Sequence, residues 1–210
     1  MREQLIENYT RNILFNQESI VNDFVYVYKD EENVLSVKKY IGSKSKIEVP
    51  DYFDEIGERA FMNTSIESVY LSENIQHIKK DAFSHSNLKS INLEKVKYLS
   101  ESCFEDTELI GSIDISNVSC IDKSVFALTL IKDIKFADFV HLSAYSFSRT
   151  YIDNLYFNSV YVEQNAFYKS LIKEIIINGD ILMEEEAFNC ATQLKKICSI
   201  KSINNKKVSI

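Results

Sequence analysis

The chain has 210 residues and a formal net charge of −7, with 45% hydrophobic and 26% charged residues, a composition typical of one globular domain. Only four glycines and one proline are present, which disfavours an all-β sandwich with many tight hairpins. The acidic balance argues against general nucleic-acid binding, and no apolar run has the length of a membrane helix, so we expect neither nucleic acid nor membrane as a partner.

The first forty residues predict an N-terminal cap, residues 1–40. Residues 3–15 form the pattern of an amphipathic helix, whose apolar face would carry Leu5, Ile6, Tyr9 and Ile13. Two β-type segments, 24–28 and 34–37, flank the polar stretch 29–33 and predict a hairpin. The helix could alternatively dock against a partner or a second copy of the chain.

The N-terminus and the cysteines both bear on the cellular compartment. Glu3 and Glu7 interrupt the apolar residues of the first helix, so the segment lacks the apolar region of a signal peptide. The four cysteines form no CxxC pair and no spacing typical of a disulfide framework or a zinc site. Scattered thiols fit a reducing compartment, and we expect the chain to be cytoplasmic.

A repeat begins after the cap and continues nearly to the end of the chain. A small residue followed by phenylalanine recurs at spacings of 22, 21, 22, 21, 20 and 21 residues. The seven phenylalanines are Phe61, Phe83, Phe104, Phe126, Phe147, Phe167 and Phe188. These spacings predict seven turns of one repeating unit across residues 41–200.

Further apolar columns keep the same period. Five residues before each phenylalanine stand Ile56, Ile78, Leu99, Ile121, Leu142, Val162 and Met183. An alternating apolar pair follows each phenylalanine, and the pairs are Val69/Leu71, Ile91/Leu93, Ile113/Ile115, Ile134/Phe136, Leu155/Phe157 and Ile175/Ile177. Another column opens each turn with Phe53, Ile75, Val96, Val118, Phe139, Val160 and Ile181. The alternating pairs predict short strands that stack at about 4.8 Å into one parallel sheet, with an aromatic spine of phenylalanines inside.

The segments YIGSKSKIEVPDYFDEIGERAF and IQHIKKDAFSHSNLKSINL carry this pattern most clearly, and they resemble the BspA-like leucine-rich repeats. The resemblance covers roughly residues 37–200. It implies an α/β but strand-rich, right-handed leucine-rich-repeat solenoid, with a parallel sheet on one side and short irregular turns on the other. It implies no catalytic chemistry, because the family has no shared catalytic motif.

The last ten residues, 201–210, predict either a C-terminal cap or a solvated basic tail. Apolar residues at Ile200, Ile203, Val208 and Ile210 alternate with polar ones and could cover the last turn. The same region contains Lys195, Lys196, Lys201, Lys206 and Lys207 and no acid. If the last turn stays uncovered, its edge could pair two copies into a homodimer.

A search for reactive groups finds no active site, metal site or cofactor site. His77 and His141 share one repeat column but lie three turns apart, too far to hold one metal, and Tyr98, Cys120 and Tyr161 in the same column favour surface packing. No glycine-rich phosphate loop or nucleophile elbow is present, and the acidic run 184–186 is typical of a solvated face. Cys103 stands in the core column and should be inert, whereas Cys198 is the better candidate for a reactive thiol.

The outward-facing middle position of each predicted strand is the candidate partner-binding face. These residues are Tyr70, Asn92, Asp114, Lys135, Tyr156 and Ile176. The second half of this ladder is the more apolar, and exposed aromatic side chains are common in binding hot spots. The sequence therefore predicts a non-catalytic protein-binding module, namely an intracellular inhibitor, immunity-type or scaffold protein. The alternative is a cell-surface or secreted adhesion repeat.

Overall fold

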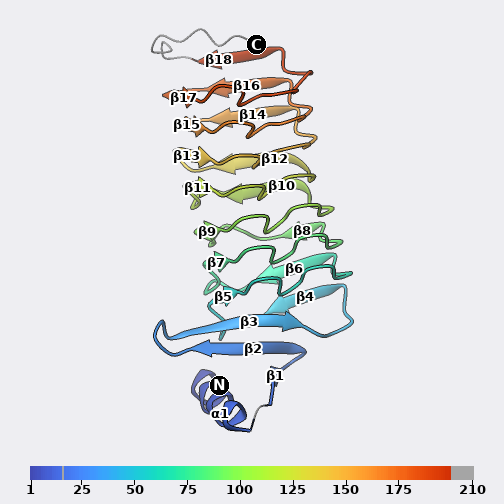
Figure 1. The fold of residues 1–210 in the computed structure, drawn as a ribbon, viewed down its shortest axis with the longest axis vertical. Coiled ribbons are helices and arrows are strands. Elements are labelled where there is room, and N and C mark those ends of the chain that lie inside the picture. The colour runs from blue at the N-terminus through green and yellow to red at the C-terminus, as the bar shows by residue number, and fades with distance from the viewer. Residues whose placement is uncertain (16, 200–210) are drawn as a thin grey trace.

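The computed structural model describes residues 1–15 and 17–199, which form a solenoid with strands on two sides and a helix at its N-terminal end (Figure 1). The helix, α1, spans Arg2–Leu14. One side of the solenoid carries a ten-stranded sheet, here called the long sheet, in the order β1-β2-β3-β5-β7-β9-β11-β13-β15-β17. Its strands are β1 (Ser19–Val21), β2 (Phe24–Lys29), β3 (Val34–Tyr40), β5 (Glu55–Ile56), β7 (His77–Ile78), β9 (Tyr98–Leu99), β11 (Cys120–Ile121), β13 (Phe139–Leu142), β15 (Ser159–Val162) and β17 (Ile181–Met183).

The other side, here called the broken side, is divided into three separate sheets. They contain β4 (Lys46–Val49), β6 (Ser68–Leu71) and β8 (Ser90–Ile91), then β10 (Ile110–Ile115) and β12 (Leu130–Phe136), then β14 (Asn154–Phe157), β16 (Glu174–Ile177) and β18 (Lys196–Ser199). All pairings on this side are parallel. Each coil of the solenoid runs from a strand of the long sheet, through a corner that contains the phenylalanine, to a strand of the broken side.

The predicted solenoid is confirmed, but the expectation of irregular turns opposite a single sheet was wrong. The alternating apolar pairs form the broken side, while the column five residues before each phenylalanine forms the long sheet. Strands such as His77–Ile78 contain two residues, of which one is buried. A strand this short shows no period-two alternation, so the sequence pattern did not reveal it.

The phenylalanine column forms the predicted aromatic spine. Neighbouring rings from Phe61 to Phe188 are stacked, with centroids 4.8 to 5.7 Å apart. Tyr40 of β3 extends the spine toward the N-terminus, with its ring centroid 5.8 Å from that of Phe61. Six of the seven phenylalanine side chains, from Phe61 to Phe167, are no more than 1% exposed, so the spine is the centre of the core.

The corners use left-handed backbone conformations without glycine. The residues two before and two after each phenylalanine have φ between 54° and 61°. They are Arg59 and Asn63, Asp81 and His85, Ser102 and Asp106, Ser124 and Leu128, Tyr145 and Arg149, Asn165 and Lys169, and Glu186 and Cys190. This conformation costs a non-glycine residue about 1–2 kcal/mol. Hydrogen bonds between coils help to offset that cost, as where the Phe61 amide donates to the Ala82 carbonyl at 2.8 Å.

A hydroxyl column closes most of these corners. Three residues after the phenylalanine, Thr64, Ser86, Thr107, Thr129 and Thr150 each donate a side-chain hydrogen bond to the carbonyl of that phenylalanine. The distances are 2.6 to 2.9 Å, and all but Thr64 are buried. Each bond gives the phenylalanine carbonyl a hydroxyl donor within the tight turn, and the Phe61 and Phe83 carbonyls also accept the backbone amides of Thr64 and Ser86.

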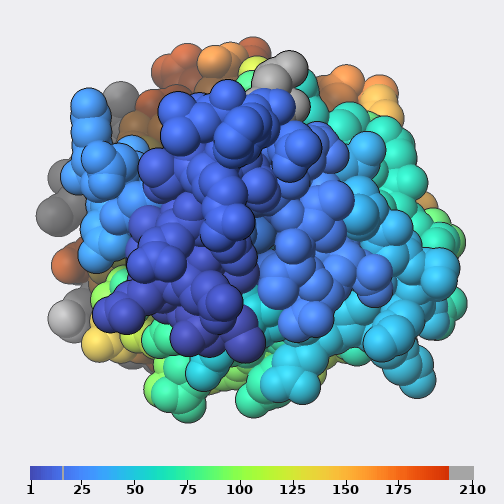
Figure 2. All heavy atoms as spheres, turned by 90° about the horizontal axis from the view of Figure 1, so that it is seen from below, coloured from blue at the N-terminus to red at the C-terminus, as the bar shows by residue number. Residues whose placement is uncertain are grey.

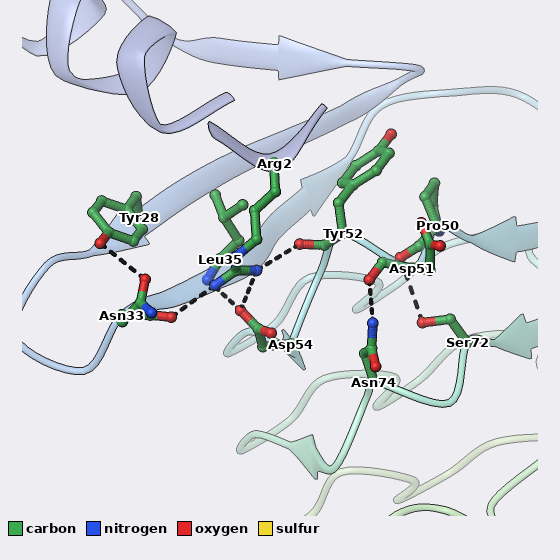
Figure 3. Close-up of polar contacts among 10 residues, drawn as sticks. All are labelled: Arg2, Tyr28, Asn33, Leu35, Pro50, Asp51, Tyr52, Asp54, Ser72 and Asn74. Carbon is green, nitrogen blue, oxygen red and sulfur yellow. Dashed lines mark hydrogen bonds and ion pairs between the residues drawn. The ribbon is translucent and has the colours of Figure 1, made fainter. Parts of the chain in front are cut away.

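The N-terminal helix and hairpin cap the first coils, as predicted. Strands β1, β2 and β3 are antiparallel, and β3 then pairs in parallel with β5, so the hairpin continues the long sheet. The guanidinium of Arg2 forms an ion pair with Asp54 at 2.7 Å (Figure 3). It also donates to the carbonyl oxygens of Asn33 and Tyr52 at 2.7 and 2.9 Å. These contacts fix the start of α1 to the first coil.

The apolar face of α1 is shorter than predicted. Leu5 is buried, and Ile6 and Tyr9 pack against the core, but Ile13 is 57% exposed. The helix ends at Leu14, and its last turn contributes no residue to the core. Figure 2 shows the N-terminal segment lying across the end of the solenoid, with the first coils visible around it.

One residue of the predicted opening column is also placed differently. Phe139 is 53% exposed, and Val140 is buried in its place. In β13 the extended backbone alternates, so Val140 and Leu142 face the core while Phe139 and His141 face outward. The predicted C-terminal cap or tail, residues 201–210, lies outside the described residues.

Candidate functional site

The candidate ladder on the broken side is split among its three sheets. Asp114 pairs with Lys135 in register across β10 and β12, and Tyr156 pairs with Ile176 across β14 and β16. Tyr70 lies in β6 opposite Glu48 of β4. The predicted residues therefore form pairs at separate places and not one continuous ladder.

The Asn92 side chain forms hydrogen bonds with the backbone of the neighbouring coil, which the sequence did not indicate. Its side-chain oxygen accepts a hydrogen bond from the Leu71 amide at 2.6 Å, and its side-chain nitrogen donates to the Leu71 carbonyl at 2.9 Å. The side chain thus takes the place of a neighbouring strand at the end of β6, where β8 has already ended at Ile91. These bonds use both groups of the amide within the fold.

Asp114 and Lys135 form an exposed ion pair. The Lys135 ammonium lies 2.7 Å from a carboxylate oxygen of Asp114, and the other oxygen accepts bonds from the Ser116 amide and hydroxyl. Burial would raise the pKa of Asp114, but the hydrogen bonds from Lys135 and Ser116 outweigh it, so the pKa lies below its usual value. The Lys135 side chain is 69% exposed and remains available to a partner.

A hollow lies where β12 and β14 run side by side without pairing as strands. We call it the β12–β14 groove; its volume is about 550 Å³. Polar and charged residues line most of it, among them Ser116, Asp133, Lys135, Asp138, Tyr156, Asn158 and Asn178. Tyr156 is 56% exposed at this groove. The structure therefore brings Lys135 and Tyr156, two of the predicted residues, to one concave site.

The long sheet presents a second outward ladder, at the column whose pattern predicts surface packing. Its residues lie six before each phenylalanine and are His77, Tyr98, Cys120, His141, Tyr161 and Leu182; Glu55 has the same position in the first coil but is buried. The rings of His77 and Tyr98 are 5.3 Å apart, and those of His141 and Tyr161 are 4.8 Å apart. The aromatic character of this column in four turns was the available signal for an interaction surface.

Carboxylates at the C-terminal half of this ladder are held in place by neutral or weakly basic donors. His141 Nε2 lies 2.7 Å from Glu163, whose other oxygen accepts from the Ala144 amide at 2.9 Å. The hydroxyl of Tyr161 donates to Glu184. This bond lowers the pKa of Glu184 and raises the pKa of Tyr161.

At the N-terminal end of the long sheet, lysine side chains neutralise the carboxylate charge of Glu55. Glu55 is 4% exposed and lies between Lys29 at 2.6 Å and Lys79 at 3.4 Å. Burial would raise the pKa of Glu55, but the bonds from Lys29 and Ser36 and the charge of Lys79 outweigh it and lower the pKa. This group is a buried, paired charge of the fold.

Among the reactive groups of the described residues, the Cys120 sulfur lies 3.8 Å from His141 Nδ1 on the long sheet, and burial, followed by the charge of Asp122, raises the pKa of the Cys120 thiol. Cys103 is buried, as predicted, and burial raises the pKa of its thiol well above the usual value. Cys198 is half-buried, with its sulfur 3.9 Å from Glu174. Over residues 1–15 and 17–199, no group of three or more His, Cys, Asp or Glu side chains is placed to hold a metal ion. Within the same ranges, no helix has the length and apolar character to cross a membrane.

These features define the class as a strand-rich repeat solenoid whose two sides both present ladders of outward residues. The BspA type leucine-rich repeat region matches residues 39–153 and 140–209, with six copies. The chain therefore belongs to the BspA-type leucine-rich-repeat family. No curated protein of similar sequence was found.

Solved structures resemble this chain at low sequence identity. A leucine rich cell surface protein from Faecalibacterium prausnitzii has 16% identity and a TM-score of 0.57, over 87% of this chain and 54% of that one. The chain thus spans about half the length of that protein. A leucine-rich repeat protein from Eubacterium ventriosum has 14% identity and a TM-score of 0.45, over 89% of this chain and 72% of that one. At 16% identity, the likeness to the Faecalibacterium prausnitzii protein concerns the fold alone.

Proposed function

We propose that the protein is a non-catalytic protein-binding module and that it recognises another protein through the broken side. The β12–β14 groove carries this proposal, because a hollow of about 550 Å³ there lies beside the exposed Tyr156 ring. Tyrosine is enriched among the residues that dominate binding free energy, and concave sites bury more of a ligand than flat ones. Repeat solenoids commonly bind partners along such extended surfaces.

The chemistry of the groove suits a polar segment of a partner protein. Asp133 and Lys135 offer charges of both signs, and Asn158 and Asn178 offer amide donors and acceptors. Tyr156 supplies a large apolar surface with a hydroxyl at its tip. Of the other predicted residues, Ile176 extends this region in register with Tyr156, whereas Tyr70 lies several coils away.

The test is affinity capture from the source organism with wild-type protein, Tyr156→Ala and Tyr70→Ala. Tyr70 is a matched control, because it occupies the same place in its coil and is 58% exposed, against 56% for Tyr156. A protein retained by wild type and Tyr70→Ala but lost by Tyr156→Ala is the expected result. Equal retention by all three variants, or equal loss with both tyrosine changes, contradicts the proposed surface.

Two cellular settings remain for this binding activity. All four cysteines are free, which suits an intracellular inhibitor, immunity-type or scaffold protein in the cytoplasm. The description of the Faecalibacterium prausnitzii structure as a cell surface protein supports the other setting, an adhesion repeat outside the cell. Protease treatment of intact cells separates the two, because only a surface protein is degraded while the membrane is closed.

A further inference from the structure

The C-terminal half of the long sheet exposes large apolar side chains on its outer face. Phe139 of β13 is 53% exposed and Leu182 of β17 is 66% exposed. Between these strands lies β15, whose Tyr161 is in register with both His141 and Leu182. The exposed side chains of Phe139 and Leu182, with the half-buried Tyr161 on the strand between them, make a patch, here called the C-terminal patch.

This patch carries acids with no lysine or arginine among them. Residues 136–148, 157–168 and 178–191, which hold β13, β15 and β17, contain no Lys or Arg; the nearest cations in sequence are Arg149 and Lys169, at the far ends of the corners. The same segments contain Asp138, Glu163, Asp180, Glu184, Glu185 and Glu186. At the N-terminal half of the same sheet, in contrast, Glu55 is paired with Lys29 and Lys79.

Two of these carboxylates have fixed orientations. Glu163 is held by His141 Nε2 at 2.7 Å and by the Ala144 amide at 2.9 Å. Glu184 accepts from the Tyr161 hydroxyl and from the Gln164 amide, the latter at 3.0 Å. Because the side chains are already ordered, a cationic partner would lose less conformational entropy on binding them.

We propose that the C-terminal patch binds a basic protein segment in which lysine or arginine side chains flank apolar ones. The cations would pair with Glu163 and Glu184 in charge-assisted hydrogen bonds, and the apolar side chains would cover Phe139 and Leu182. The exposed face of Tyr161 adds a site for a cation above its ring. This surface lies on the opposite side of the solenoid from the β12–β14 groove, so it stands independently of the function proposed above.

The test measures fluorescence anisotropy of labelled synthetic peptides with the full chain. One peptide alternates lysine and leucine, and its counterpart alternates glutamate and leucine. The expected result is binding of the lysine peptide only, with affinity that falls as salt is raised. Failure of the lysine peptide to bind, or equal binding of the glutamate peptide, overturns the proposal.

Paired variants separate this patch from the net charge of the protein. Glu163→Gln/Glu184→Gln removes two charges from the patch but keeps a side-chain oxygen as acceptor at each position. Glu67→Gln/Glu108→Gln removes two charges elsewhere, beside Lys89. The patch variant should weaken peptide binding at least tenfold and flatten its salt dependence, while the control stays near wild type. Equal weakening by both variants shows a response to net charge alone and overturns the proposal.

A second change tests the apolar part of the patch. Leu182→Ser should weaken binding of the lysine–leucine peptide several-fold without altering the salt dependence, because it leaves both carboxylates in place. Circular dichroism of each variant checks that the solenoid is retained. A Leu182→Ser variant that folds and binds like wild type contradicts the apolar contact.

Discussion

At the residue scale, Ser146 places a polar hydroxyl in the column of small residues that directly precede the phenylalanines. Its oxygen is buried and has no hydrogen-bond partner among the described residues, whereas Ala60, Ala82, Ala166 and Ala187 stand at the same position of other coils. An unpaired buried hydroxyl costs about 1–3 kcal/mol. Ser146→Ala should therefore raise the free energy of unfolding by about 1 kcal/mol, measured by urea denaturation.

A matched substitution in the neighbouring hydroxyl column should change the free energy of unfolding in the opposite direction. Thr129 donates to the Phe126 carbonyl at 2.8 Å and is fully buried. Thr129→Val keeps the shape but leaves that carbonyl short of a donor, so it should lower the stability by about 1–3 kcal/mol. If Ser146→Ala destabilises the protein as much as Thr129→Val, the Ser146 hydroxyl contributes as much as a hydrogen-bonded one. That result would contradict its description as an unpaired buried group.

The left-handed corner positions give a second residue-scale prediction. Arg149 has φ of 55° and an exposed side chain. Arg149→Gly should be neutral or stabilise by up to about 1 kcal/mol, because glycine adopts this conformation without steric cost. Arg149→Val should destabilise by about 1–2 kcal/mol, since a β-branched residue is poorly suited to positive φ. Thermal unfolding of both variants checks the order, and a more stable valine variant would contradict it.

At the element scale, the cap and the first coils depend on the ionisation of Glu55 in β5. Its pKa is below the usual value of 4.5 in the folded protein, so the unfolded chain takes up a proton first as the pH falls. The stabilising contribution is fully present above pH 4.5 and is lost as the pH drops through the lower, folded pKa. Urea titrations over this acid range should show a smaller pH dependence for Glu55→Gln than for wild type. An unchanged dependence would show that the Lys29 and Lys79 pairs contribute nothing.

Much of the element order could be predicted from the sequence, and the misses have physical causes. Phenylalanine spacing gave the coils, and turn residues between two β-type segments gave the β2–β3 hairpin. The long sheet was missed because strands such as Cys120–Ile121 are too short to alternate. The exposure of Phe139 was missed because the sequence spacing cannot show that β13 is fully extended.

The candidate surfaces were harder to predict than the fold. Sequence periodicity identified which strand residues face outward, and Tyr70, Lys135 and Tyr156 are indeed exposed. It could not show that Asn92 bonds the backbone of Leu71, because that contact depends on where β8 ends. The β12–β14 groove could not be predicted from the sequence either, because it lies where β12 and β14 do not pair as strands.

At the scale of the whole molecule, each coil is stabilised mainly by its two neighbours, as expected for a solenoid. Phe104 is fully buried between Phe83 and Phe126, with centroids 5.5 and 5.7 Å away. Phe188 is only partly buried, and the ring stacked on it among the described residues is that of Phe167. Phe104→Ala should cost about 3–5 kcal/mol, and Phe188→Ala clearly less, in urea denaturation. Equal costs would contradict a core built from contacts between neighbouring coils.

In the function proposed above, the solenoid binds a protein partner through its sides and not through its capped N-terminal end. The most direct measurement is amide hydrogen exchange of the full chain, alone and with the partner obtained by affinity capture. We predict slower exchange in residues 130–138 and 154–158, which border the β12–β14 groove. Slower exchange confined to α1 and the β2–β3 hairpin, with both sides of the solenoid unchanged, would contradict the claim.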